Sequence, residues 1–112
     1  MTVARLKELL GLTSLTGELP AREIEGVYVG DLLSRVMGQL HTGELWITIM
    51  TNKNIVAVAE LCDPCAILLS EGAEPMPEAL TAAKEYGVPL LSSSKSTYEL
   101  CSALSTVLKS EP

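Results

Sequence analysis

The second half of the chain repeats one unit three times, and this repeat constrains the fold more than any other feature of the sequence. Each unit is a short run of apolar residues, then a polar loop, then a segment with helical spacing. The apolar runs lie at 45–50, 66–69 and 88–91. A half-exposed strand would alternate apolar and polar residues, so continuous apolar runs indicate parallel strands that are covered on both faces. The sequence therefore predicts an α/β fold, with a mostly parallel sheet and helices on both of its faces.

Length and composition predict a single small domain. The chain has 112 residues, of which 47% are apolar, and no linker, charge block or low-complexity segment divides it. We expect one domain over 1–112, with its core at about 2–108. No apolar run approaches the ~18 residues that a membrane-spanning helix needs. Residues 1–8 also carry charges where a signal peptide needs an apolar stretch. We therefore expect a cytoplasmic protein that has no contact with membranes.

The acidic charge of the chain limits its partners. The formal net charge is -6. Non-specific binding to DNA or RNA depends on Lys and Arg side chains that neutralise phosphates. The charge balance therefore argues against a nucleic-acid partner.

The first forty residues contain weaker signals. Their spacing and turn residues predict a helix at 3–10, short strands at 13–16 and 24–29, and a helix at 32–40. Gly11 fits the C-cap of the first helix. Asp31 stands directly before the second helix, where an Asp side chain often serves as the N-cap. We expect Asp31 to cap that helix.

The helix that begins near Asn54 is apolar on more than one side. One face is made by Ile55, Val58, Ala59 and Cys62, and Val56 lies on the other side. A helix that is apolar nearly all round is buried on more than one side. In so small a domain, a second subunit is the simplest source of the extra cover. The pattern predicts a homodimer that buries part of this helix.

The last two helices have clear end signals. Pro77 fits the first position of one helix and Gly87 its end, and its expected apolar face is Leu80, Ala83 and Tyr86. The final helix begins with Ser96 and Glu99, which have the spacing of a capping box.

Cys62 and Cys65 have the C-x-x-C spacing of redox and metal motifs. A structural zinc site needs four ligands, and only Cys101 and His41 remain, both distant in sequence. Thioredoxin-like motifs follow a strand and open a helix, whereas this motif follows a helix and precedes a strand. We interpret the pair as buried structural thiols, and a redox-sensing pair is the alternative hypothesis.

Motifs for catalysis are missing from the sequence. It contains no G-x-S-x-G, G-x-x-x-x-G-K-[ST] or G-x-G-x-x-G stretch. His41 alone builds neither a triad nor a metal site, and we expect it in a surface turn. We therefore predict no catalytic residues, no metal and no cofactor.

Two loops after predicted strands suit an anion. The segments Thr51-Asn52-Lys53-Asn54 and 92–97 each carry one Lys with hydroxyl or amide groups, and each leads into the amino end of a helix. Free backbone N–H groups at that end bind phosphate and carboxylate well. Ordinary helix capping uses the same residue types, so both interpretations stay open.

The order of these segments resembles the DRTGG domain family. The resemblance rests on the strand 45–50 with its loop 51–53, the strand end Leu68-Leu69-Ser70-Glu71-Gly72, and the segment Gly87-Val88-Pro89-Leu90-Leu91-Ser92. The Asp-Arg pair of the family falls on Asn52-Lys53, and its Thr-Gly-Gly falls on Ser70-Glu71-Gly72. Only Gly72 is retained. The substitutions remove a carboxylate and a guanidinium and add the carboxylate of Glu71.

This family is an accessory domain found beside phosphotransacetylase catalytic domains and within CBS-containing pyrophosphatases, and it is similar in fold to the amino-terminal domain of HPr kinase/phosphorylase. The resemblance implies a regulatory or scaffolding module that dimerises and has no catalytic activity. The tentative ligand-binding residues are Thr51, Asn52, Lys53, Ser70, Gly72, Ser92 and Lys95.

The leading hypothesis is a non-catalytic module that binds a protein partner and senses a small anionic metabolite or nucleotide. The alternative is a redox sensor that acts through Cys62 and Cys65. A third hypothesis, an enzyme related to serine kinases, follows from the HPr kinase similarity, but the phosphate-binding loop of that protein lies in another domain.

Overall fold

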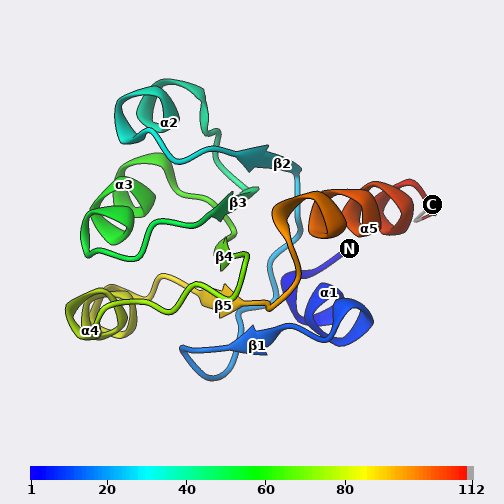
Figure 1. Ribbon diagram of the computed structural model, residues 1–112, viewed down its shortest axis with the longest axis horizontal. Helices are drawn as coiled ribbons and strands as arrows, with labels where there is room; N and C mark the ends of the chain where they lie inside the picture. The colour runs from blue at the N-terminus through cyan, green and yellow to red at the C-terminus, as the bar shows by residue number, and fades with distance from the viewer. Residues whose placement is uncertain (111–112) are drawn as a thin grey trace.

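The computed structural model describes residues 1–110 and places a five-stranded sheet between two layers of helices (Figure 1). The helices are α1 (Val3–Leu10), α2 (Leu33–Gln39), α3 (Asn54–Cys62), α4 (Pro77–Tyr86) and α5 (Thr97–Ser110). The strands are β1 (Thr13–Ser14), β2 (Gly26–Val29), β3 (Glu44–Thr48), β4 (Ala66–Leu69) and β5 (Leu90–Ser92). The three repeated units of the sequence are β3 with α3, β4 with α4, and β5 with α5.

The sheet has the strand order β1-β5-β4-β3-β2. Strands β2 to β5 are parallel, and β1 lies antiparallel to β5 at one edge. The opposite edge is β2, which pairs with β3 in the register Val27 to Leu45. The predicted α/β class with a mostly parallel sheet is confirmed.

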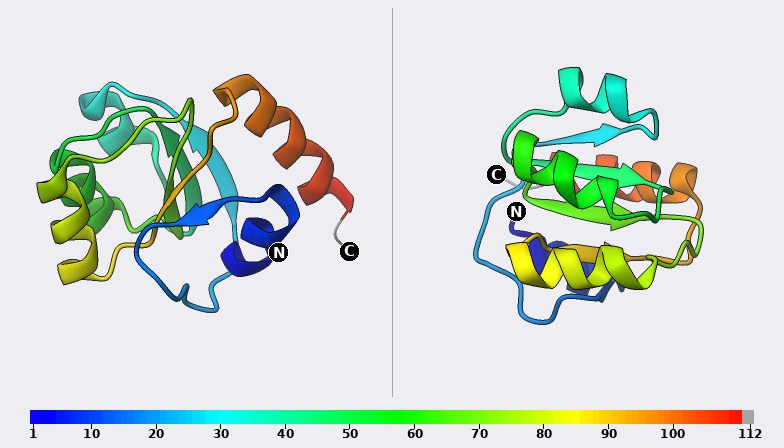
Figure 2. Two further views of the ribbon diagram at one scale, coloured as in Figure 1. Left: turned by 60° about the horizontal axis from the view of Figure 1, so that its bottom comes forward. Right: turned by 90° about the vertical axis from the view of Figure 1, so that its left-hand side faces the viewer.

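The helices divide unequally between the two faces of the sheet. Figures 1 and 2 show α2, α3 and α4 on one face and α1 with α5 on the other. Each face has its own hydrophobic cluster. Trp46, Ile67 and Leu90 belong to the cluster under α2, α3 and α4, and Ile47 and Leu68 belong to the cluster under α1 and α5. Neighbouring residues of one strand alternate between the clusters, as side chains of a strand covered on both faces must.

The end signals of three helices act as predicted. Gly11 ends α1 in the left-handed conformation, with φ of 65°, and Gly87 ends α4 in the same way. At the start of α5, the N–H of Glu99 donates to Ser96 Oγ at 3.1 Å, and the N–H of Ser96 donates to Glu99 Oε1 at 3.1 Å. This reciprocal pair is the predicted capping box.

Asp31 does not cap α2, which corrects the prediction. The N-cap of α2 is Leu32, and no side chain accepts a hydrogen bond there. Asp31 Oδ1 instead accepts hydrogen bonds from Thr48 Oγ1 at 2.7 Å and from the N–H of Ile49 at 2.9 Å. The carboxylate therefore ties the end of β2 to the end of β3. Sequence spacing places Asp31 before the helix, but the neighbouring strand offers it two donors at once.

The reason given for a homodimer on α3 is also wrong. Val56 is 1% exposed in the single chain, because it lies in the cluster that α2, α3 and α4 build together. A second subunit is not needed to cover it. The predicted face of α4 needs a smaller correction, since Tyr86 is exposed and the buried residues are Ala79 and Ala83.

No helix in residues 1–110 is long and apolar enough to cross a membrane.

Candidate functional site

The predicted ligand loops follow the carboxyl ends of the parallel strands, so they lie together at one end of the sheet. Backbone hydrogen bonds join these loops to each other and to the strand ends. The N–H of Ser70 donates to Thr48 O at 3.3 Å, the N–H of Ser93 to Leu69 O at 2.9 Å, and the N–H of Met76 to Thr51 O at 2.9 Å. The loops after β3, β4 and β5 therefore form one connected cluster, as expected for an open α/β sheet.

Glu71 occupies the amino end of α5. Its backbone has φ of 62°, a conformation that residues other than glycine rarely adopt. Its N–H donates to Lys95 O at 2.8 Å. Its Oε2 accepts a hydrogen bond from the N–H of Thr97, the first residue of α5, at 2.6 Å. The chain thus places one of its own carboxylates where a bound anion would meet the helix.

The residues on either side of Glu71 have structural tasks. Ser70 is fully buried, and its Oγ shares a hydrogen bond with Thr97 Oγ1 at 2.6 Å. Gly72 has φ of 70°, and its N–H donates to Ser93 O at 3.0 Å. Together these contacts fasten the loop after β4 to the loop after β5. The glycine retained from the family pattern lies where the backbone needs a positive φ.

In the loop after β3, a polar side chain forms a hydrogen bond within the segment itself. Asn52 Oδ1 accepts a hydrogen bond from the N–H of Asn54 at 2.9 Å. Thr51 is half-buried, and Lys53 is exposed at the N-cap of α3 without a capping side chain. The capping interpretation of this segment therefore accounts for Asn52, and Lys53 is the group left at the surface for a ligand.

The two candidate lysines border different hollows. Lys53 lines a hollow of about 250 Å³ with Val56 of α3 and Ala82 of α4. Lys95 lines a shallow hollow of about 490 Å³ along α5, with Tyr98 and Glu99. Ser92 is half-buried at the end of β5. The seven predicted residues thus lie at the same end of the sheet, where the strands have their carboxyl ends, but the hollows beside the two lysines are separate.

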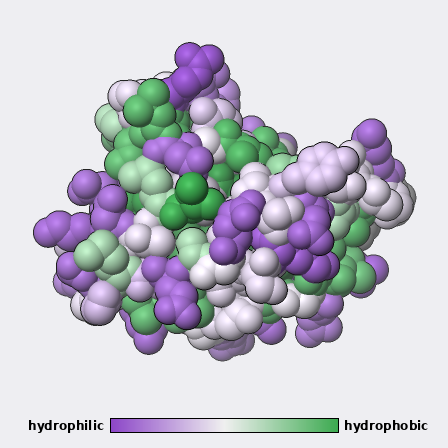
Figure 3. All heavy atoms as spheres, in the orientation of Figure 1, coloured by the Kyte–Doolittle hydropathy of each residue, from purple (hydrophilic) through white to green (hydrophobic). Residues whose placement is uncertain are grey.

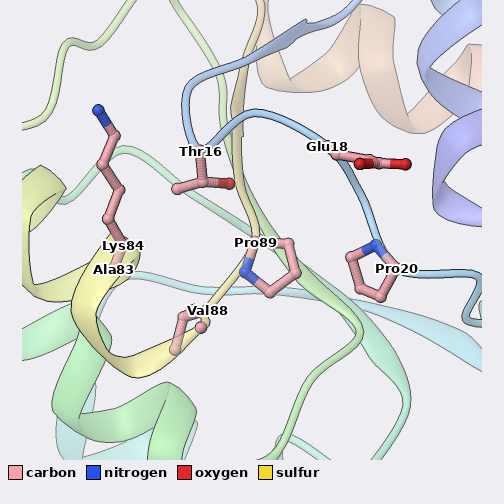
Figure 4. A pocket seen from close by; sticks show the side chains of 8 residues that line it. Thr16, Glu18, Pro20, Ala83, Lys84, Val88 and Pro89 are labelled. Atoms are coloured by element: carbon pink, nitrogen blue, oxygen red, sulfur yellow. The ribbon is translucent and has the colours of Figure 1, made fainter.

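A further hollow, of about 130 Å³, lies near the start of β5 (Figure 4). Pro20 and Pro89 border it, and Thr16 Oγ1 there accepts a hydrogen bond from the N–H of Leu90 at 3.2 Å. Figure 4 shows Lys84 extending upward on the left and Glu18 extending to the right, away from each other. The charged groups of this hollow therefore do not converge on one point.

Arg22 and Asp63 form a fork near the amino ends of the strands that the sequence analysis missed. Nη1 donates to Oδ1 at 2.9 Å and Nη2 to Oδ2 at 3.0 Å, and Nη2 also donates to Asp63 O. The hydrogen bond from Arg22 lowers the pKa of the Asp63 carboxyl below its usual value. Asp63 has φ of 59°, so the fork holds a left-handed turn between Cys62 and Cys65.

Cys62 and Cys65 belong to different faces of the sheet. Cys62 packs against the cluster under α2, α3 and α4, while Cys65 is part of the cluster under α1 and α5. Both are free thiols. Burial raises the pKa of each, that of Cys65 to about 11. The thiols are therefore poorly placed to react with each other.

His41 lies exposed in a turn, as predicted, and its Nδ1 is 3.5 Å from Glu44 Oε1. Within residues 1–110, no three His, Cys, Asp or Glu side chains gather as metal ligands.

Comparison with solved structures finds the same fold in a regulatory protein. One match is the crystal structure of the CBS and DRTGG domains of the regulatory region of Clostridium perfringens pyrophosphatase, complexed with the activator diadenosine tetraphosphate. The TM-score is 0.66 at 13% sequence identity, over 88% of this chain and 43% of that chain. The present chain therefore spans less than half the length of that region.

A comparison with curated proteins found no match. The model of the family described as HPr Serine kinase N terminus matches residues 46–108. This match covers more than half of the chain, including the strands β4 and β5 and the helices α3 and α4. The predicted resemblance is thereby confirmed: the chain is a DRTGG-type domain and belongs to the HPr serine kinase N-terminus family.

Proposed function

We propose that the chain is a regulatory module without chemistry of its own, which binds a protein partner and responds to a small anionic metabolite or nucleotide. The fold it shares with a regulatory region supports the regulatory role, since that region was crystallised with a nucleotide activator. The family model is described as the N terminus of an HPr serine kinase, and the phosphate-binding loop of that protein lies in another domain, which agrees with a module that catalyses no reaction.

One observation carries the proposed anion response: the carboxylate of Glu71 lies 2.6 Å from the N–H of Thr97 at the start of α5. The partial positive charge at a helix amino end favours a negative group there. A phosphate or carboxylate ligand that reaches the same N–H must displace Glu71. The bound and free states of the module would then differ in the position of the loop 70–72.

Neighbouring groups suit the displaced state. Lys95 is exposed two residues before the first residue of α5, and Ser93 Oγ already accepts a hydrogen bond from the N–H of Lys95 at 3.1 Å. Movement of Glu71 would change its backbone hydrogen bond to Lys95 O, so a change in the loop after β4 would reach the loop after β5. A partner that contacts either loop would sense the ligand.

The redox alternative has less support from the geometry. Cys62 and Cys65 lie in clusters on opposite faces of the sheet, and the Arg22 to Asp63 fork holds the turn between them. A disulfide would require this turn to rearrange.

Titration calorimetry against adenine nucleotides and inorganic phosphate tests the anion response. Removal of the competing carboxylate by Glu71→Gly, which also restores the family residue, should strengthen binding. The double variant Lys53→Ala with Lys95→Ala should weaken it. Lys84→Ala is the matched control, because this exposed lysine lies on α4 and borders the hollow near the start of β5.

A further inference from the structure

A groove runs between α3 and α4, on the face of the sheet opposite α5. The two helices lie side by side there (Figure 2). Lys53, Glu60 and Tyr86 border one hollow of about 250 Å³, and Glu60 and Tyr86 also border a second hollow of about 280 Å³. The two hollows therefore adjoin. Together they reach the range of about 300–1,000 Å³ that is usual for small-molecule sites.

Three side chains on this groove have no partner in the chain. Within residues 1–110, the side chains of Lys53, Glu60 and Tyr86 form no hydrogen bond or ion pair. All three are exposed, Tyr86 by 56%. Figure 3 shows hydrophilic residues at the left of the view, over α3 and α4, so this side of the molecule is not an apolar contact surface. A cation, an anion and an aromatic ring thus border one groove and are free to bind.

The two charges have a fixed order along the groove. Lys53 is the N-cap of α3, near the carboxyl ends of the strands. Glu60 lies on the same face of the helix, about 10 Å farther along its axis. Tyr86 is the last residue of α4 and borders both hollows, as Glu60 does. A negative group is therefore favoured at the Lys53 end and disfavoured beside Glu60.

We propose that this groove binds a nucleoside monophosphate, with the phosphate at Lys53, the ribose hydroxyls at Glu60 and the base stacked on Tyr86. A carboxylate is a common acceptor for ribose hydroxyls in nucleotide sites. Aromatic side chains stack on any base, because every base has a π-face. This inference rests on the nucleotide response proposed above. It places the phosphate at the end of the sheet where Glu71 also lies, so Glu71 opposes its charge.

A nucleotide uses all three groups, whereas simpler ligands use only some of them. Inorganic phosphate would contact Lys53 and leave Glu60 and Tyr86 without a partner. A cation such as a guanidinium would suit Tyr86 and Glu60 but not Lys53. A nucleoside monophosphate carries its negative charge at one end only, which matches the order of Lys53 and Glu60 along the groove.

Titration of isotope-labelled protein with AMP, adenosine and inorganic phosphate, followed by NMR, tests the site. AMP should shift the amide signals of Ala57 and Ala82, which border the first hollow. Tyr86→Leu should weaken AMP and adenosine roughly fivefold or more, because it removes the stacking surface. Tyr86→Phe should bind like wild type. Tyr98→Leu is the matched control, since Tyr98 is an exposed tyrosine on α5.

Two further variants test the phosphate and ribose contacts. Lys53→Ala should weaken AMP a few-fold and leave adenosine unchanged, because only AMP carries the phosphate. Wild type should bind 2′-deoxy-AMP more weakly than AMP, and Glu60→Gln should reduce this difference. Both residues are exposed, so each variant should keep its fold, checked by circular dichroism.

Failure of this site and failure of the anion response are distinguishable. AMP that leaves the signals of α3 and α4 unchanged at millimolar concentration would overturn the site, as would equal affinity of Tyr86→Leu and wild type. The anion response is measured with inorganic phosphate on Glu71→Gly, which involves no base. If Tyr86→Leu weakens AMP while Glu71→Gly binds phosphate no better than wild type, then the groove is supported and the role of Glu71 is contradicted.

Discussion

Arg22 and Asp63 lie 41 residues apart in the chain and meet in a fork of two hydrogen bonds, at 2.9 and 3.0 Å. The fork joins the segment before β2 to the turn after α3. It also fixes the left-handed backbone of Asp63, which begins the connection to β4. One ion pair therefore holds the Cys62 to Cys65 turn near the amino ends of the strands.

The fork should give the protein an acid-dependent stability. The hydrogen bond from Arg22 lowers the pKa of Asp63 in the folded state. The stabilisation is therefore complete above the unfolded pKa, near 4, and is lost as the pH falls through the folded pKa. Both groups are partly exposed, so we expect about 0.2–1 kcal/mol.

Asp63→Asn isolates this effect, because asparagine also tolerates a left-handed backbone. The variant should melt below wild type at pH 6, and the difference should shrink below about pH 4. Thermal unfolding followed by circular dichroism across this range provides the check. A difference that stays constant with pH would show that the ion pair contributes nothing.

Glu71 should respond differently to alanine and to glycine. Alanine removes the carboxylate that accepts from Thr97 but keeps the positive φ, so we expect a loss of about 1 kcal/mol. Glycine removes the same contact and also the backbone strain, so its loss should stay within about 0.5 kcal/mol. Urea unfolding measures both variants. Equal stability of the two would argue that the backbone of residue 71 is not strained.

Val56 should be essential for the fold of the single chain. Val56→Glu places a carboxylate in the closed cluster between the helices and the sheet, and should cost more than about 3 kcal/mol. Ala57→Glu is the matched control, because Ala57 is exposed on the same helix. Its effect should stay within about 0.5 kcal/mol. If Val56→Glu is folded and monomeric while wild type is a dimer, the structure's account of Val56 is contradicted and a second subunit covers this residue.

Cys65 should resist modification in the folded protein. It is fully buried, and burial raises its pKa to about 11, so only about one thiol in a thousand is ionised at pH 8. Mass spectrometry after alkylation should find Cys65 unmodified in native buffer and modified in urea. Rapid formation of a Cys62 to Cys65 disulfide under mild oxidant would overturn the structural role of these thiols.

Local patterns in the sequence were enough to predict most of the fold. Continuous apolar runs identified β3, β4 and β5, because strands covered on both faces carry no alternation. The capping box of Ser96 and Glu99 depends on residues three apart, so its geometry follows from the spacing alone.

The contacts between distant segments could not be predicted in this way. Asp31 accepts a hydrogen bond from Thr48 of β3 and does not cap the adjacent helix. Val56 is buried in a cluster with residues of α2 and α4. The position of Glu71 on the amino end of α5 required the relative placement of two loops that are 26 residues apart. Each depends on which strands are neighbours, and a single sequence does not specify that order.

The most direct test of the proposed anion response is the affinity of adenine nucleotides and inorganic phosphate for wild type and Glu71→Gly, measured by titration calorimetry. If Glu71 competes with the ligand for the amino end of α5, then Glu71→Gly binds more tightly than wild type, and the gain is larger at low salt. The opposite result is heats that match buffer dilution for both proteins at every salt concentration. That outcome would contradict anion sensing and leave a module that acts through protein contacts alone.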